Sequence, residues 1–66
     1  MALTQPATIT DADLSRMVTS SWREAARCWQ EYRAADPSIR SMLRQSAEYA
    51  EAWWRTLHAE QARRAS

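Results

Sequence analysis

Apolar residues recur every three or four positions over two long stretches of this chain, and a short break separates the stretches. The first stripe consists of Leu14, Met17, Val18, Trp22, Ala25, Cys28, Trp29 and Tyr32. The second consists of Ile39, Met42, Leu43, Ala47, Ala50, Trp53, Trp54 and Leu57. Such spacing places side chains on one face of an α-helix, and no stretch alternates with period two as a half-buried strand does. The pattern predicts an all-α chain.

The break between the stripes is the sequence from Ala35 to Ser38. Pro37 has no amide hydrogen and disfavours helical geometry at the residue before it, so Asp36 is predicted to cap a second helix that starts at Pro37. The first helix is predicted to start after Thr10, with Asp13 at the capping-box position. We therefore expect a two-helix antiparallel hairpin, with helices over about 11–35 and 37–63.

The rest of the chain follows from these boundaries. Residues 1–9 are predicted to be a flexible lead-in, residues 10–64 the hairpin domain, and the chain past Arg63 is expected to fray. Four oppositely charged pairs stand at i,i+4, where they stabilise solvated helices slightly. They are Arg27/Glu31, Arg44/Glu48, Glu51/Arg55 and Glu60/Arg64.

Folding the chain back at Pro37 predicts which residues oppose each other across the two helices. The predicted pairs are Tyr32/Ile39, Cys28/Leu43, Ala25/Ser46, Ser21/Ala50, Val18/Trp53 and Leu14/Leu57. Small residues meet in the middle, so the helices are expected to approach closely. The candidates for self-association are Leu14, Val18, Ala25, Tyr32, Leu43, Ala50, Trp53 and Leu57.

Composition favours a dimer. The chain has 66 residues and four Trp, each able to bury about 150–250 Å², which is more apolar surface than two helices cover. Small domains use a disulfide, a metal or a second subunit to compensate, and one Cys with one His excludes an internal disulfide and a zinc cluster. We expect a homodimer that forms an antiparallel four-helix bundle.

The candidate chemistry is sparse. There is no Gly, so phosphate-cradling loops are excluded, and the single His58 has no identifiable nucleophile near it. Cys28 lies on the apolar stripe, where cysteine usually acts as a small hydrophobe. We expect a protein that is not an enzyme, with no catalytic residues, no metal, no cofactor and no small-molecule substrate.

The N-terminal residues Met1 to Gln5 lack the basic and apolar regions of a signal peptide, and no stretch contains the ~20 apolar residues that span a bilayer. The expected location is the cytoplasm, without membrane association.

Trp, Tyr and Arg dominate binding hot spots, and this chain is rich in all three. The partner-binding candidates are Trp22, Arg23, Arg27, Trp29, Tyr49 and Trp54. They favour a small protein-interaction module that binds and occludes a larger host protein such as a transcription factor. Phage and mobile-element inhibitors, adaptors and anti-activators are of this kind.

The alternative is an RNA- or DNA-binding regulator. Arg16, Arg23 and Arg27 form a basic stripe on the first helix, although the net charge is only +1, which is small for a nucleic-acid binder. In length and hairpin layout the chain resembles the dimeric plasmid RNA-binding regulators of the Rop type, and that resemblance implies a role in binding RNA.

Overall fold

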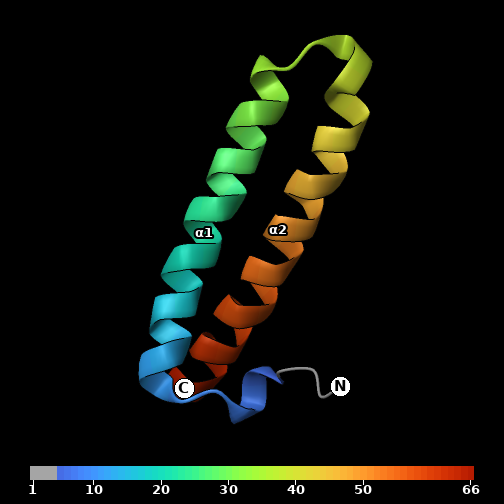
Figure 1. Cartoon of the computed structure of the whole chain (residues 1–66). Coiled ribbons are helices and arrows are strands. Elements are labelled where there is room, and N and C mark those ends of the chain that lie inside the picture. Colours follow the sequence, from blue (N-terminus) through green and yellow to red (C-terminus); the bar gives the residue numbers. More distant parts are fainter. Residues whose placement is uncertain (1–4) are drawn as a thin grey trace.

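The computed structural model describes residues 5–66 and consists of two antiparallel helices joined by a short turn (Figure 1). A 3₁₀ turn, η1 (Pro6–Thr8), precedes α1 (Asp11–Ala34) and α2 (Pro37–Ala65). The predicted all-α hairpin is confirmed. The molecule measures 42 × 27 × 16 Å, and a helix with its side chains is about 10–12 Å across. The hairpin is therefore a single layer, and both sides of the contact between its helices face outward.

The start of α1 is capped as the sequence predicts. Thr10 is the N-cap, and its side chain accepts a hydrogen bond of 3.3 Å from the amide of Asp13. Asp11 and Asp13 stand in the first turn, where the helix dipole favours negative charge. The carboxylate of Asp13 pairs with Arg16, and within the described residues it accepts no hydrogen bond from the amide of Thr10, so only the Thr10 half of the predicted capping box forms.

The turn between the helices uses two extended residues. Ala35 and Asp36 have ψ angles of 152° and 146°, as expected for chain that leads into a proline. Asp36 is the N-cap of α2 and Pro37 is its first residue, as predicted, but the side chain of Asp36 makes no capping hydrogen bond. Arg40 donates to the carbonyl of Ala35 at 3.2 Å, which holds the end of α1 against the start of α2. The reversal therefore needs no glycine.

A single line of side chains joins the helices, and we call it the seam. The seam consists of Leu14, Val18, Ser21, Ala25, Cys28 and Tyr32 from α1 and Leu43, Ala47, Ala50, Trp54 and Leu57 from α2. Ala47 and Leu57 are completely buried, and Leu14 is 1% exposed. The hydroxyl of Ser21 donates to the carbonyl of Val18 at 3.1 Å, which satisfies the only buried polar residue in the described chain. Most of the predicted self-association candidates thus lie between the two helices of one hairpin.

The predicted pairing across the seam is wrong at several positions. Ser46 is exposed and Ala47 is buried, and Trp53 is 38% exposed while Trp54 is half-buried. Ile39, expected opposite Tyr32, is 45% exposed. The seam of α2 therefore follows positions 43, 47, 50, 54 and 57 instead of 43, 46, 50, 53 and 57. Both series have helical spacing, and the observed one places an alanine methyl where a serine hydroxyl would need a buried partner.

The open end of the hairpin is closed by Arg64. Its guanidinium donates to Asp11 of α1 at 2.7 Å, to the carbonyl of Pro6 at 2.9 Å and to Glu60 at 2.7 Å. The N-terminal segment crosses beneath the end of α2, next to the start of α1 (Figure 1). Arg64 therefore links the lead-in, α1 and α2.

This network changes the prediction for the C-terminus. The second helix does not end at residue 63 as expected: α2 continues to Ala65, and Arg64 contacts Pro6, Asp11 and Glu60. Fraying of the last residues stays a prediction. Residues 6–8 of the lead-in form η1, and Met1–Thr4 lie outside the described residues. The flexibility of the lead-in as a whole stays a prediction.

All four of the predicted i,i+4 ion pairs form, at 2.5 Å for Arg27–Glu31, 2.8 Å for Arg44–Glu48, 2.9 Å for Glu51–Arg55 and 2.7 Å for Glu60–Arg64. The first three are largely exposed, so each contributes only a few tenths of a kcal/mol. The packed seam and the Arg64 network at the end of the hairpin opposite the turn contribute more to the stability of the hairpin.

Substitutions at the neighbouring residues 46 and 47 test the seam. Ala47→Leu is expected to overpack the contact between the helices and to lower the free energy of unfolding by ~1–3 kcal/mol, measured by urea denaturation. The matched change Ser46→Leu adds the same bulk at an exposed position, so it should stay within about 0.5 kcal/mol of the parent. The reverse order would mean that Ser46 faces α1.

The network at the open end predicts a pH dependence. Hydrogen bonds from Arg63 and Arg64 lower the pKa of Glu60 from 4.5 to about 2. A carboxylate with a lowered pKa stabilises the fold above its unfolded pKa, and that stability is lost as the pH falls towards the folded value. The melting temperature followed by circular dichroism should therefore drop between about pH 5 and pH 2, and the drop should be smaller in Glu60→Gln. An equal drop in both proteins would contradict this role.

Candidate functional site

Three of the four tryptophans gather on one side of the seam. Trp22 and Trp54 line two adjoining hollows there: one also contains Trp29, Arg33 and Glu51, and the other also contains Arg23 and His58. Because Trp22 and Trp54 belong to both hollows, the two form one shallow groove along the hairpin. We call this side the Trp22 flank. It brings together four of the predicted partner-binding candidates, Trp22, Arg23, Trp29 and Trp54.

The rings of this flank are held by contacts within the chain. The indole of Trp29 donates to Glu51 across the seam at 3.2 Å, and its ring meets the ring of Tyr32 edge-on, with centroids 5.5 Å apart. Trp54 stacks on His58 at 5.1 Å. Trp22 has no aromatic partner in the described chain and is 56% exposed. The flank thus presents one open indole between rings that are fixed in place.

The Trp22 flank carries arginines without carboxylate partners, whereas most charged residues of the molecule are paired. Seven of the eight acidic residues form ion pairs, and Asp36 is the exception. Among the described residues, three arginines have no carboxylate partner: Arg23, Arg33 and Arg40. Arg23 and Arg33 line the groove, and the guanidinium of Arg40 lies 5.9 Å from the centre of the Tyr32 ring. The excess positive charge therefore collects beside the tryptophans.

Arg27, also a predicted partner-binding candidate, is placed differently. It pairs with Glu24 and, at 2.5 Å, with Glu31, and hydrogen bonding to Glu24 raises its pKa. It lines a hollow on the outer surface of α1 together with Arg16, Thr19 and Arg23. Arg23 therefore stands at the border between this outer hollow and the Trp22 groove, whereas Arg27 lines only the outer hollow. Its charge is neutralised locally.

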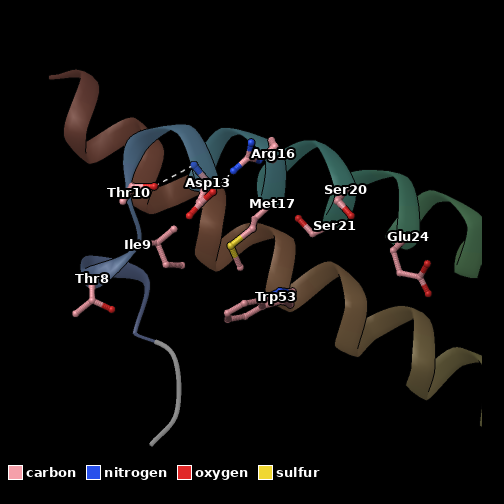
Figure 2. A pocket seen from close by; sticks show the side chains of 10 residues that line it. All are labelled: Thr8, Ile9, Thr10, Asp13, Arg16, Met17, Ser20, Ser21, Glu24 and Trp53. Atoms are coloured by element: carbon pink, nitrogen blue, oxygen red, sulfur yellow. Dashed lines mark hydrogen bonds and ion pairs between the residues drawn. The ribbon is translucent and has the colours of Figure 1, made fainter.

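The opposite side of the seam carries the fourth tryptophan, and we call it the Trp53 flank. Figure 2 shows Met17, Ile9 and Trp53 directed into one open space between the lead-in, α1 and α2. A neighbouring hollow contains Tyr49, Trp53 and Cys28. The ionised groups at its edge are Asp13 with Arg16 and Glu24 with Arg27, which are paired. This flank is apolar and balanced in charge.

Exposed apolar side chains are concentrated on this second flank. Ile39 is 45% exposed, Met42 60%, Tyr49 81% and Trp53 38%. Their spacings of three, seven and four residues place them along one face of α2. Tyr49 thus lies away from Trp54, as its position in the sequence predicts, and the partner-binding candidates are divided between two surfaces.

Other chemistry is limited. Cys28 is 9% exposed, and its burial raises the pKa of the thiol, as expected for a residue of the core. Within residues 5–66, no group of three His, Cys, Asp or Glu side chains is placed to hold a metal ion. In the same part of the chain, neither helix is both long and apolar enough to cross a membrane.

Sequence reasoning missed Arg33, Arg40 and the bond between Trp29 and Glu51. A usable signal exists for the arginines: Arg23 has no acid three or four positions away, and for Arg33 and Arg40 the only acid at that spacing is Asp36, in the turn. The bond to Glu51 joins residues 22 positions apart, so it depends on how the helices pack.

Comparisons of the chain with protein-family models, curated proteins and solved structures find no match.

Proposed function

We propose that this chain is a small non-enzymatic interaction module that docks on a larger protein through its Trp22 flank. It acts as an inhibitor or adaptor by covering a surface that the partner needs, such as the DNA-binding or assembly surface of a transcription factor. An anti-activator encoded by a phage or another mobile element is an example of such a protein. The proposed place of action is the cytoplasm.

The observation that carries this proposal is the exposed indole of Trp22 between fixed rings and unpaired arginines. Trp and Arg are the residues that most often dominate binding energy, above all where the surrounding groups exclude water. Trp29 and Trp54 are held by Glu51 and His58, so little side-chain freedom remains to be lost on binding. A preorganised surface binds more tightly than a mobile one of the same area.

The second part of the proposal is a homodimer that forms a four-helix bundle through the Trp53 flank. The exposed Ile39, Met42, Tyr49 and Trp53 form an apolar strip about 21 Å long at the helical rise of 1.5 Å per residue. In a two-fold dimer the same patch meets itself, which a charge-balanced face tolerates without repulsion. The dimer would leave both Trp22 flanks free for partners.

Loss of capture tests the docking surface. Trp22→Ala should weaken binding to proteins captured from a host lysate by at least about 2 kcal/mol, or roughly thirtyfold in Kd. Circular dichroism should stay unchanged, because the side chain is 56% exposed. Tyr49→Ala removes an even more exposed aromatic ring from the other flank and should keep capture. Equal capture by Trp22→Ala and the parent would contradict docking through this flank.

Light scattering tests the dimer. The purified chain should have twice the mass of one copy, and the double variant Met42→Glu/Tyr49→Glu should have the mass of one copy while it keeps its helicity. Both residues are more than half exposed, so the change should not disturb the seam. Trp22→Glu should remain dimeric. A monomeric parent that melts cooperatively would rule out the bundle.

A further inference from the structure

We infer that the partner segment received by the Trp22 flank is an acidic amphipathic helix whose carboxylates meet Arg23 and Arg33. This inference rests on the proposed docking function and adds the chemical class of the partner. It is carried by the unpaired arginines at the groove, by their spacing, and by the open indole of Trp22 next to Arg23.

The groove carries positive charge that the chain itself does not neutralise. Arg23 and Arg33 line the groove, and the described chain offers neither of them a carboxylate. Glu51 is the one acid that lines the groove, and it is already bonded to Trp29 at 3.2 Å and to Arg55 at 2.9 Å. A complementary surface must therefore bring its own negative charge, and complementary charge is what sets specificity and the rate of encounter.

The spacing of the two arginines matches that of a partner helix. Arg23 and Arg33 are ten positions apart on α1, which corresponds to about 15 Å along the helix axis. A helix laid along the groove presents two residues at this distance on one face when they are ten or eleven positions apart. Apolar side chains at the positions between them would meet the rims of Trp29 and Trp54, and an apolar side chain just beyond the acid opposite Arg23 would meet Trp22. This arrangement is the helix-in-groove mode of peptide recognition.

A second copy of the chain fits this flank poorly. A two-fold contact would set the flank on itself, so arginines without partners would approach arginines without partners. The acids that could meet them in another copy are already paired, apart from Asp36 beside the turn. The Trp53 flank has no such conflict.

Nucleic acid also fits less well. Single strands bind by stacking successive bases on exposed rings, whereas Trp54 is covered by His58 and Trp29 is packed against Tyr32. One open ring and a few separate arginines do not form a track for phosphates. The separate arginines of this flank are instead suited to pair with a few individual carboxylates.

The experiment selects peptides against the intact protein. A display library of random peptides of about 18 residues, about 27 Å long as helices, is panned against the full chain, and the enriched peptides are titrated by calorimetry and by NMR of the four indole N–H signals. We expect enriched peptides with Asp or Glu ten or eleven positions apart and apolar residues between them. The signals of Trp22, Trp29 and Trp54 should shift, while that of Trp53 serves as the internal control.

Charge variants make the test quantitative. Arg23→Gln/Arg33→Gln should weaken the selected acidic peptides at least about tenfold, whereas Arg16→Gln, an exposed arginine already paired with Asp13, should change Kd by less than about twofold. Arg23→Glu/Arg33→Glu should bind versions of the same peptides with Lys in place of the acids.

Four results would overturn the inference: no enriched peptide, enriched peptides without paired acids, binding that survives loss of both arginines, or tight binding of an oligouridylate RNA by the parent chain in place of the peptides. Failure here is distinct from failure of the docking function. If lysate capture needs Trp22 but ignores Arg23 and Arg33, the flank docks on a partner of different chemistry.

Discussion

The close approach of α1 and α2 along a line of small side chains determines the rest of this molecule. In the middle of the seam, Ser21, Ala25, Ala47 and Ala50 are all small, and the indoles of Trp22 and Trp53 lie on opposite sides of it, where they are 56% and 38% exposed. Because the hairpin is one layer thick, nothing in the same chain can cover these sides. A core that leaves Trp22 and Trp53 exposed thus produces two separate surfaces, one apolar and balanced in charge, the other aromatic and bordered by unpaired arginines.

A narrow seam stabilises a short chain only if both ends of the hairpin are fixed. At one end Pro37 restricts the backbone and Arg40 bridges to the carbonyl of Ala35. At the other end Arg64 holds Asp11, Pro6 and Glu60 together. Because these contacts hold both ends of the hairpin, α1 and α2 cannot rotate freely about their axes. The residues on each flank therefore keep their positions relative to one another. This rigidity is what a surface needs if it is to bind a partner helix without a large loss of conformational freedom.

Local rules of the sequence account for much of this structure. Thr10, Asp36 and Pro37 define the helix starts within the chain itself, and the i,i+4 ion pairs follow directly from helix geometry. The rotation of α2 was not predictable in the same way, because Ser46 with Trp53 and Ala47 with Trp54 satisfy the same helical spacing, and only packing against α1 separates them. The contacts of Arg64 and the bond between Trp29 and Glu51 join distant positions. The aromatic residues of the candidate site and Arg23 were therefore found from composition, whereas Arg33 and Arg40 were recognised only after the ion pairs had been assigned.

The nuclear Overhauser effects of the Ala47 methyl group test the central claim most directly. A sample that mixes labelled and unlabelled chains separates contacts within one chain from contacts between copies. We expect strong cross peaks within one chain from Ala47 to seam residues of α1 such as Ala25 and Cys28, and weaker ones from the side chain of Ser46, which lines the hollow beside Cys28. Cross peaks from Ser46 to α1, with Ala47 silent, would contradict the seam and the two surfaces that depend on it.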